Sequence, residues 1–363
     1  MVRNLLSSVA MIAISAVTQA AFADEVTSPS AKVQTIETAP ADSGSADTAD
    51  TSSEGGLKDI VVTATRRSVD LQRVSAVVVA LPSETLRTFN VNGVLQLPNL
   101  VSGLVVTPSG GNNVFLRGIG SASTGYNEAQ TAVYIDGLYL ANPAMGIYSF
   151  NNIDQIEVLK GPQGTLYGRN VTGGLISVTT RKPGDTTRID ASVGYANYDT
   201  LTANLYASAP LSETLSANIA VFHQKQSKGW SFNTFTGHDD QKSDETGLQA
   251  KLAWQPSSAT KVTASFIYDY NNRDLGYSYQ VFPGTVGTDG SVYLGKYLHA
   301  ARIDASAPFH AYIASLKIEQ DLGFAKLMSL TGYQTSNANV LFAGGLPILG
   351  QPIAGQSGGY NQF

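Results

Sequence analysis

Glycine spacing is the feature of this sequence that most directly suggests chemistry, because glycine-rich turns after strands can bind phosphate through main-chain N–H groups. Gly118 and Gly120 follow a β-type run, but Ser123 stands where a dinucleotide-binding motif has its third glycine, and no amphipathic helix follows. Residues 161–164 (GPQG) lack the Lys-Ser/Thr pair of a phosphate-binding loop. The sequence therefore argues against nucleotide binding.

Metal-binding and catalytic patterns are sparse. The chain has no cysteine, which excludes disulfides and thiolate sites, and its 4 histidines share no helical metal-ligand spacing. One connection carries a run of carboxylates, for which a calcium site and a solvated acidic run are the alternatives, the second being favoured. These carboxylates are Asp239, Asp240, Asp244 and Glu245. No nucleophile is patterned with a base, so we expect no enzymatic activity, no metal and no cofactor.

Composition favours a β-rich protein. Charged residues are 14% of the 363, below the usual share, whereas 35 glycines and 17 tyrosines suit tight turns and strands. The net charge of −5 and the absence of a dense Lys/Arg cluster exclude nucleic acid as an expected partner.

Residues 1–56 have the composition of an export signal followed by an unfolded leader. Arg3, the apolar run 5–17 and the small-x-small residues 21–23 predict a signal peptide over 1–23. A membrane anchor is the alternative, but the apolar run is too short to span comfortably. Residues 24–56 are acidic and lack aromatic side chains, which predicts disorder.

Residues 57–186 predict a compact α+β domain. Ser83 is a candidate N-cap of one helix, and a second helical stretch at 94–97 ends at Pro98. Asp136 and Gly137 give a two-residue hairpin signal. Strands are expected at 104–107, 114–117, 132–135, 138–140, 153–159 and 175–180.

After Pro183 the chain alternates apolar and polar residues, as in 201–209, 248–255 and 262–271. Segments of about ten residues with one apolar face suit a membrane β-barrel, although a soluble sandwich shows the same alternation. Strand lengths, alternating short and long connections and the export signal favour the barrel. We expect strands near 188–196, 200–210, 214–226, 245–255, 260–271, 311–320 and 324–336. Aromatic residues expected at the membrane interfaces are Tyr195, Tyr198, Trp230, Trp254 and Tyr333.

Four segments together resemble the plug domain of TonB-dependent outer-membrane receptors. They are 59–64 (DIVVTA), 114–120 (VFLRGIG), 133–138 (VYIDGL) and 153–178, which begins IDQIEVLKGP. Their order and spacing over about 120 residues make the match specific. The resemblance implies an α+β plug domain at 57–186, followed from 187 to 363 by an antiparallel transmembrane β-barrel.

The barrel is expected to be incomplete. Small barrels of about eight strands have room only for their own side chains, whereas plugged outer-membrane transporters have about 22 strands. The strands expected here cannot close around a plug, so we expect a receptor fragment or the product of a truncated gene.

The resemblance implies that 59–64 is the TonB box, which binds the energy-transducing TonB protein of the inner membrane. A β-prone segment behind a flexible arm can add to another protein's sheet edge through main-chain hydrogen bonds. A first plug strand is the alternative. The coupling residues are Asp59, Ile60, Val61, Val62, Thr63 and Ala64.

Two further sets of site residues follow from the resemblance. Charged plug residues are expected to hold the plug in the barrel by a breakable polar network, with solvated surface charge as the alternative. This set is Arg117, Glu157, Lys160 and Arg169. Outward plug loops are expected to bind the ligand by hydrogen bonding and stacking. This second set is Tyr126, Asn127, Tyr139 and Asn142.

The function implied by the resemblance is TonB-dependent import of a scarce solute across the outer membrane of a Gram-negative bacterium. The expected ligand is a ferric siderophore, and the expected partners are TonB, outer-membrane lipid and this ligand. The alternatives are uptake of a saccharide or another organic compound by the same mechanism, and a passive pore or adhesin. Signal relay would require a folded N-terminal domain, for which the leader is too short.

Overall fold

The computed structural model describes two domains that lie within the compact unit Ile60–Phe363. The described residues are 61–62, 69–70, 76–89, 91, 93–107, 113–120, 129–141, 152–274, 284, 286, 290, 292, 297–299, 303–339 and 341. The expected signal peptide and acidic leader lie outside them. Within the described part of the chain, no helix is long and apolar enough to cross a membrane.

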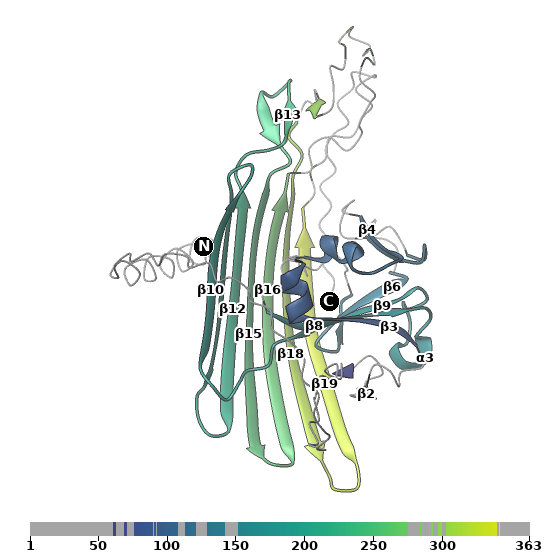
Figure 1. Ribbon diagram of the computed structural model, residues 1–363, viewed down its shortest axis with the longest axis vertical. Helices are drawn as coiled ribbons and strands as arrows, with labels where there is room; N and C mark the ends of the chain where they lie inside the picture. Colours follow the sequence, from purple (N-terminus) through teal and green to yellow (C-terminus); the bar gives the residue numbers. More distant parts are fainter. Residues whose placement is uncertain are drawn as a thin grey trace, which may run out of the picture. The chain divides into compact units, whose positions relative to one another are not determined.

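A five-stranded sheet forms the centre of the N-terminal domain (Figure 1). Its order is β3-β8-β9-β6-β7, in which β6 and β9 pair in parallel and the other neighbours are antiparallel. The strands are β3 (Val77–Pro82), β6 (Thr131–Ile135), β7 (Leu138–Tyr139), β8 (Ile153–Lys160) and β9 (Gly174–Thr180). Two small hairpins accompany the sheet, β1 (Val61–Val62) with β2 (Val69–Asp70) and β4 (Leu104–Thr107) with β5 (Asn113–Leu116).

Both faces of this sheet are buried, which explains why apolar residues follow one another in strands such as β3. Ile156 and Ile176 belong to the main core on one face, together with Leu86 of the helix α2. Leu159 and Leu175 belong to a second core on the other face. A strand with both faces buried gains from an apolar side chain at every position, so period-two alternation is lost.

The helices are short and differ in detail from the prediction. They are α2 (Ser83–Thr88), the 3₁₀ helix η2 (Val94–Asn99) and α3 (Gly164–Tyr167). Ser83 is the first helical residue rather than the cap; the N-cap is Pro82, and no side chain caps this end. Pro98 lies inside η2, so the second helical stretch ends one residue later than expected.

The predicted hairpin at Asp136 and Gly137 is confirmed. It joins β6 to β7, and both turn residues have positive φ, 50° and 88°. Two consecutive positive φ angles are typical of a type I′ turn, whose twist matches that of the flanking strands. The turn therefore holds the Asp136 side chain in a defined direction.

The C-terminal domain is a seven-stranded antiparallel sheet of order β10-β11-β12-β15-β16-β18-β19 (Figure 1). The strands are β10 (Arg188–Ala196), β11 (Thr200–Pro210), β12 (Leu215–Gln226), β15 (Ser243–Ser257), β16 (Thr260–Arg273), β18 (Ala307–Asp321) and β19 (Lys326–Ala338). Each coincides with an expected strand to within a few residues. The edges of the described sheet are β10 and β19.

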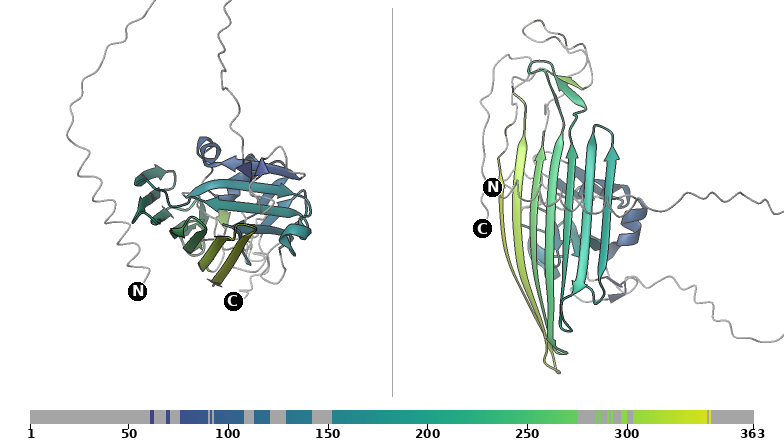
Figure 2. Two further views of the ribbon diagram at one scale, coloured as in Figure 1. Left: turned by 90° about the horizontal axis from the view of Figure 1, so that it is seen from below. Right: turned by 90° about the vertical axis from the view of Figure 1, so that its left-hand side faces the viewer.

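The two faces of this sheet differ chemically, and Figure 2 shows its strands side by side. Leu252, Phe266 and Leu316 are exposed on one face, where Leu252 pairs with Ala264 and Ala264 with Leu316. The opposite face carries polar side chains such as Lys251, which contact the N-terminal domain. An apolar outer face with a polar inner face is the pattern of a membrane-barrel wall.

A small sheet lies in the long connections after β12 and β16. It consists of β13 (Ser231–Asn233), β14 (His238–Asp240) and β17 (Leu298–His299), in the order β14-β13-β17. Trp230 belongs to this region and makes an edge-on contact with Tyr297, with 5.5 Å between ring centroids. Trp230 directly precedes β13 and is thus next to a strand end, whereas Tyr333 lies inside β19, five residues from its end.

Candidate functional site

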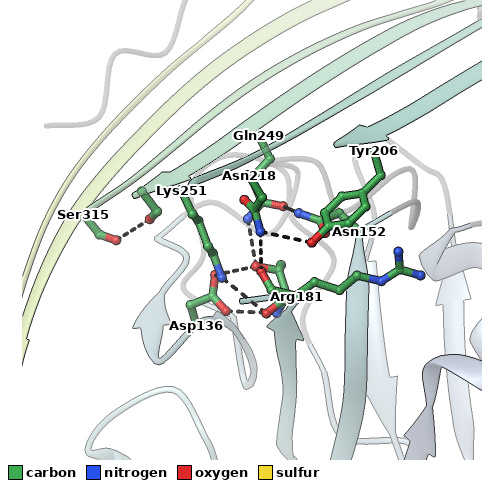
Figure 3. Close-up of polar contacts among 10 residues, drawn as sticks. Asp136, Asn152, Arg181, Tyr206, Asn218, Gln249, Lys251 and Ser315 are labelled. Carbon is green, nitrogen blue, oxygen red and sulfur yellow. Dashed lines mark hydrogen bonds and ion pairs between the residues drawn. The ribbon is translucent and has the colours of Figure 1, made fainter. Parts of the chain in front are cut away.

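The central polar contact between the two domains is made by Asp136 (Figure 3). Its Oδ1 accepts a hydrogen bond from the Thr180 main-chain N–H at 2.9 Å, and its Oδ2 accepts one from the Thr180 hydroxyl at 2.9 Å. The Nζ of Lys251 in β15 lies 2.8 Å from Oδ2. The carboxylate therefore joins the β6–β7 turn, the end of β9 and the seven-stranded sheet.

A chain of amide groups extends this contact. Gln249 Nε2 donates to the Thr180 hydroxyl oxygen at 2.9 Å, and Asn152 Nδ2 donates to Gln249 Oε1 at 2.8 Å. Lys251 Nζ also donates to the Thr180 carbonyl oxygen at 3.3 Å. The Thr180 hydroxyl thus donates a hydrogen bond to Asp136 and accepts one from Gln249, so donor and acceptor roles are fixed along this series of hydrogen bonds.

Burial makes this contact costly to disrupt from one side only. The Lys251 side chain is 5% exposed and that of Asp136 is 22% exposed. Removing one partner of a buried pair leaves an uncompensated charge and costs about 3–5 kcal/mol, whereas the pair as a whole adds little net stability. The contact therefore specifies where the N-terminal domain sits on the sheet more than it stabilises either domain.

A second contact is made by Arg181, directly after β9. Its Nη1 lies 3.0 Å from Asp190 Oδ2, and its guanidinium lies 4.9 Å from the centre of the Tyr206 ring. Its carbonyl oxygen accepts a hydrogen bond from Asn218 Nδ2 at 3.0 Å. These partners belong to β10, β11 and β12, so one residue binds three neighbouring strands.

A third contact is made by Gln334 of β19. Its Nε2 donates to the Tyr139 carbonyl oxygen at 2.8 Å, and its Oε1 accepts from the Ala141 N–H at 3.1 Å. Nearby, Leu138 occupies the space beside Gly332, where an added Cβ would lie 2.4 Å from Leu138 Cδ1. The side-chain amide of Gln334 thus satisfies main-chain groups at the end of β7.

Comparison with known sequences decides what the N-terminal domain is. The family model described as TonB-dependent Receptor Plug Domain matches residues 70–175. Residues 70–175 are a plug domain of the TonB-dependent receptor type.

Two curated relatives show how much of a receptor this chain spans. It is 32% identical to the Pesticin receptor of Yersinia pestis over 187 residues, which are 50% of this chain and 27% of that protein. It is 28% identical to the Vitamin B12 transporter BtuB of Vibrio vulnificus (strain YJ016) over 183 residues, 48% of this chain and 28% of that protein. The chain therefore spans about a quarter of the length of these relatives.

Solved structures show the same fold. The ferric yersiniabactin uptake receptor FyuA from Yersinia pestis matches with a TM-score of 0.63 and 20% identity, over 74% of this chain and 42% of that one. The ferripyoverdine receptor of Pseudomonas aeruginosa matches with a TM-score of 0.64 and 17% identity, over 81% of this chain and 39% of that one. The expected fold of an α+β plug followed by antiparallel barrel strands is confirmed. These relatives and neighbours are named as receptors and transporters, not as enzymes.

The plug and the barrel wall also share apolar contacts. Phe309, Ala311 and Ile313 of β18 belong to the same buried cluster as Ile135 and Val178 of the plug sheet. The inner face of the wall is thus polar with one apolar area, on which the plug packs. Burial of this area and the Asp136 contact together position the plug.

The predicted charged residues come from different segments of the plug. Glu157 is buried in the middle of β8 and accepts a hydrogen bond from Gln155 Nε2 at 3.0 Å. Arg117 is exposed in the turn after β5 and has a positive φ of 52°. Lys160 is half-buried at the end of β8, and Arg169 is exposed after α3. The plug–barrel contacts described above use other residues, and a joint network of these four stays a prediction.

The predicted ligand residues are described only at Tyr139. Its hydroxyl accepts a hydrogen bond from Asn170 Nδ2 at 2.9 Å, and its ring lies 5.5 Å from that of Tyr134. These contacts hold Tyr139 against the second plug core. Tyr126, Asn127 and Asn142 lie outside the described residues.

The predicted coupling segment is described only at Val61 and Val62. These two residues form β1, which pairs with Asp70 and Val69 of β2. Asp59, Ile60, Thr63 and Ala64 lie outside the described residues. The register shows that this part of the segment adopts strand geometry and offers main-chain groups for pairing.

Sequence reasoning identified Asp136 only as a turn residue and missed its partners. Lys251 and Gln249 occupy polar positions of an alternating strand. This pattern could have predicted that Lys251 needs a carboxylate partner, because a lysine on an inward face requires a counter-ion. Nothing in the sequence connected them with Thr180. Among the described residues, no group of three or more His, Asp or Glu side chains is placed to hold a metal ion.

Proposed function

We propose that this protein imports a scarce solute across the outer membrane of a Gram-negative bacterium, with energy delivered by the TonB protein. The observation that carries the proposal is the polar attachment of the plug to the wall, in which the central contact is made by Asp136, Thr180 and Lys251. A domain fixed in this way has a defined resting position and can still be released, because polar contacts re-form with water when they open. A plug attached in this way suits a transporter that opens only when TonB supplies energy.

The outer face of the wall supports a membrane location. Its exposed apolar side chains include Ile189, Ile219 and Leu252, and a face of this kind is costly in water. The alternation with polar inward residues is the pattern that lipid outside and water inside require.

Coupling is assigned to the segment that contains Val61 and Val62. Its described ladder with β2 has only two residue pairs, so few hydrogen bonds oppose its transfer to another sheet edge. TonB is the partner expected to take over this pairing.

The ligand is assigned to the ferric siderophore class, in line with structural neighbours named as a ferric yersiniabactin uptake receptor and a ferripyoverdine receptor. Cobalamin is the second candidate, because one relative is named as a vitamin B12 transporter. Equilibrium binding of ferric siderophores and of cobalamin to the purified receptor separates the two. Tight binding of cobalamin alone would overturn the siderophore assignment.

The test of the transport mechanism sets uptake beside binding. Cells that carry the receptor are expected to bind the solute with or without a proton gradient and to accumulate it only with one. A passive pore would admit the solute in both conditions, and that result would refute energy-coupled import.

In the same assay, joint replacement of Tyr126, Asn127, Tyr139 and Asn142 by Ala is expected to weaken binding.

A further inference from the structure

A cavity of about 540 Å³ lies between the plug helix α2 and strands β10, β11 and β12 of the barrel wall. This volume is within the range of small-molecule sites. From the plug it is lined by Leu86 and Arg87, and from the wall by polar residues that include Ser192, Asn204 and Gln224.

The attachment of the plug to the wall is asymmetric around this cavity. Polar contacts fix the plug to β15 through Asp136 and to β19 through Tyr139 and Ala141. On the cavity side, Leu86 packs α2 into the buried apolar cluster that the plug shares with β18. Among the described residues, no hydrogen bond or ion pair joins α2 to β10, β11 or β12. The plug contact with these three strands is made instead by Arg181, which also lines the cavity, whereas the Asp136 and Gln334 contacts lie outside the lining.

The charges around the cavity favour an anion. Asp190 faces it, but this carboxylate is bound by both Arg181, at 3.0 Å, and Arg188, at 2.9 Å. Arg87, also on the lining, has no ion-pair partner in the described part of the chain. Of the charged residues on the lining, Arg87 and Arg181 are positive and Asp190 is negative, so the lining carries one net positive charge beside neutral hydroxyl and amide groups.

We propose that this cavity is a subsite for an anionic, oxygen-rich solute on its route past the plug, with Arg87 as the selecting charge. Guanidinium groups bind carboxylate and other oxyanions through several N–H donors at once. The neutral hydroxyl and amide groups opposite add weaker hydrogen bonds, which permit binding without trapping. This proposal rests on the proposed transport function, because a route past the plug has meaning only in a transporter.

The test uses the absence of cysteine from the chain. Asn204→Cys places a thiol on the cavity wall of the receptor in the outer membrane of its own cells, and the receptor without this substitution gives the background rate of modification. Its modification rates with an anionic and a cationic methanethiosulfonate reagent are each divided by that reagent's rate with free 2-mercaptoethanol. We expect the normalised rate of the anionic reagent to exceed that of the cationic one by about threefold or more.

Two substitutions on α2 separate the role of Arg87 from a general charge effect. Arg87→Glu should invert the preference, whereas Glu84→Gln, an exposed residue of the same helix outside the lining, should leave it unchanged. Ala311→Cys, in the apolar plug contact, should react with neither reagent because this position is 1% exposed.

Equal normalised rates at Asn204→Cys, or a preference that Arg87→Glu does not change, would overturn the anion subsite. These rates depend neither on TonB nor on the identity of the solute. The two proposals can therefore be refuted separately. The ratio of the normalised reagent rates tests the anion subsite, and uptake without a proton gradient would refute energy-coupled transport.

Discussion

The Nζ of Lys251 in the barrel wall lies 2.8 Å from Oδ2 of Asp136 in the plug, and both groups are largely shielded from water. Asp136→Asn keeps the turn, since asparagine tolerates positive φ, and removes the negative charge. Because Lys251 is then buried without a counter-ion, we expect the plug–barrel contact to weaken by about 3–5 kcal/mol. Urea titration of plug release, followed by limited proteolysis, measures the loss.

A second substitution makes this prediction specific. Adding Lys251→Met to Asp136→Asn removes the buried positive charge that has lost its counter-ion, so most of the lost stability should return. Asp154→Asn, on an exposed residue of β8, serves as the control and should have no effect. An Asp136→Asn receptor as resistant as the native one would show that the ion pair does not hold the plug.

Gly332 of the wall gives a steric test of plug seating. A Cβ at this position would lie 2.4 Å from Leu138 Cδ1, so Gly332→Ala should lower stability by about 1–3 kcal/mol. Gly194→Ala is the matched control, because the nearest atom to its Cβ is 4.0 Å away. Thermal unfolding in detergent measures both. In a Leu138→Ala background the Gly332→Ala cost should vanish, and an undiminished cost there would rule out this clash as its cause.

The coupling segment is predicted to work through its main chain. Adjacent strand residues direct their N–H groups to opposite edges, so at least one of Val61→Pro and Val62→Pro should remove a donor that TonB requires. We expect that variant to abolish energised uptake while solute binding stays normal. Val61→Thr keeps the donor and the β-branch and should be nearly silent. Normal uptake by both proline variants would leave the segment as an ordinary plug strand.

Asp304 forms hydrogen bonds with residues in and beside the small sheet β14-β13-β17, and its ionisation should control whether this sheet stays ordered. Burial raises the pKa of Asp304, but hydrogen bonds from His238, Thr236 and Asn233 outweigh it and place the pKa below its ordinary value of 3.8. A carboxyl with a lower pKa in the folded state contributes stability above the unfolded pKa and loses it as the pH falls through the folded one. The small sheet that contains Asn233 and His238 should therefore loosen below about pH 4.

The fluorescence of Trp230, which contacts Tyr297 beside this sheet, reports that loosening in a Trp254→Phe background. Asp304→Asn should remove the acid transition, and Asp185→Asn, an exposed residue elsewhere, should retain it. An unchanged transition in Asp304→Asn would assign the pH dependence to another group.

The sequence by itself determined the strands, because their signals are local. Alternation over about ten residues requires only that one face is apolar, and the positions of β10, β11 and β16 followed from it. The turn at Asp136 and Gly137 was equally predictable, since few residue pairs adopt two positive φ angles.

Only the tertiary structure decided which side chains join the plug to the wall. Lys251 lies 115 positions after Asp136 (251 − 136) and 71 after Thr180, and no local pattern encodes a contact at such separations. The family resemblance suggested Glu157, which the structure buries within the plug sheet. The pairing of Asp136 with Lys251 depends on the register of β15 against β12 and on the seating of the plug, and both are set by packing over the whole sheet.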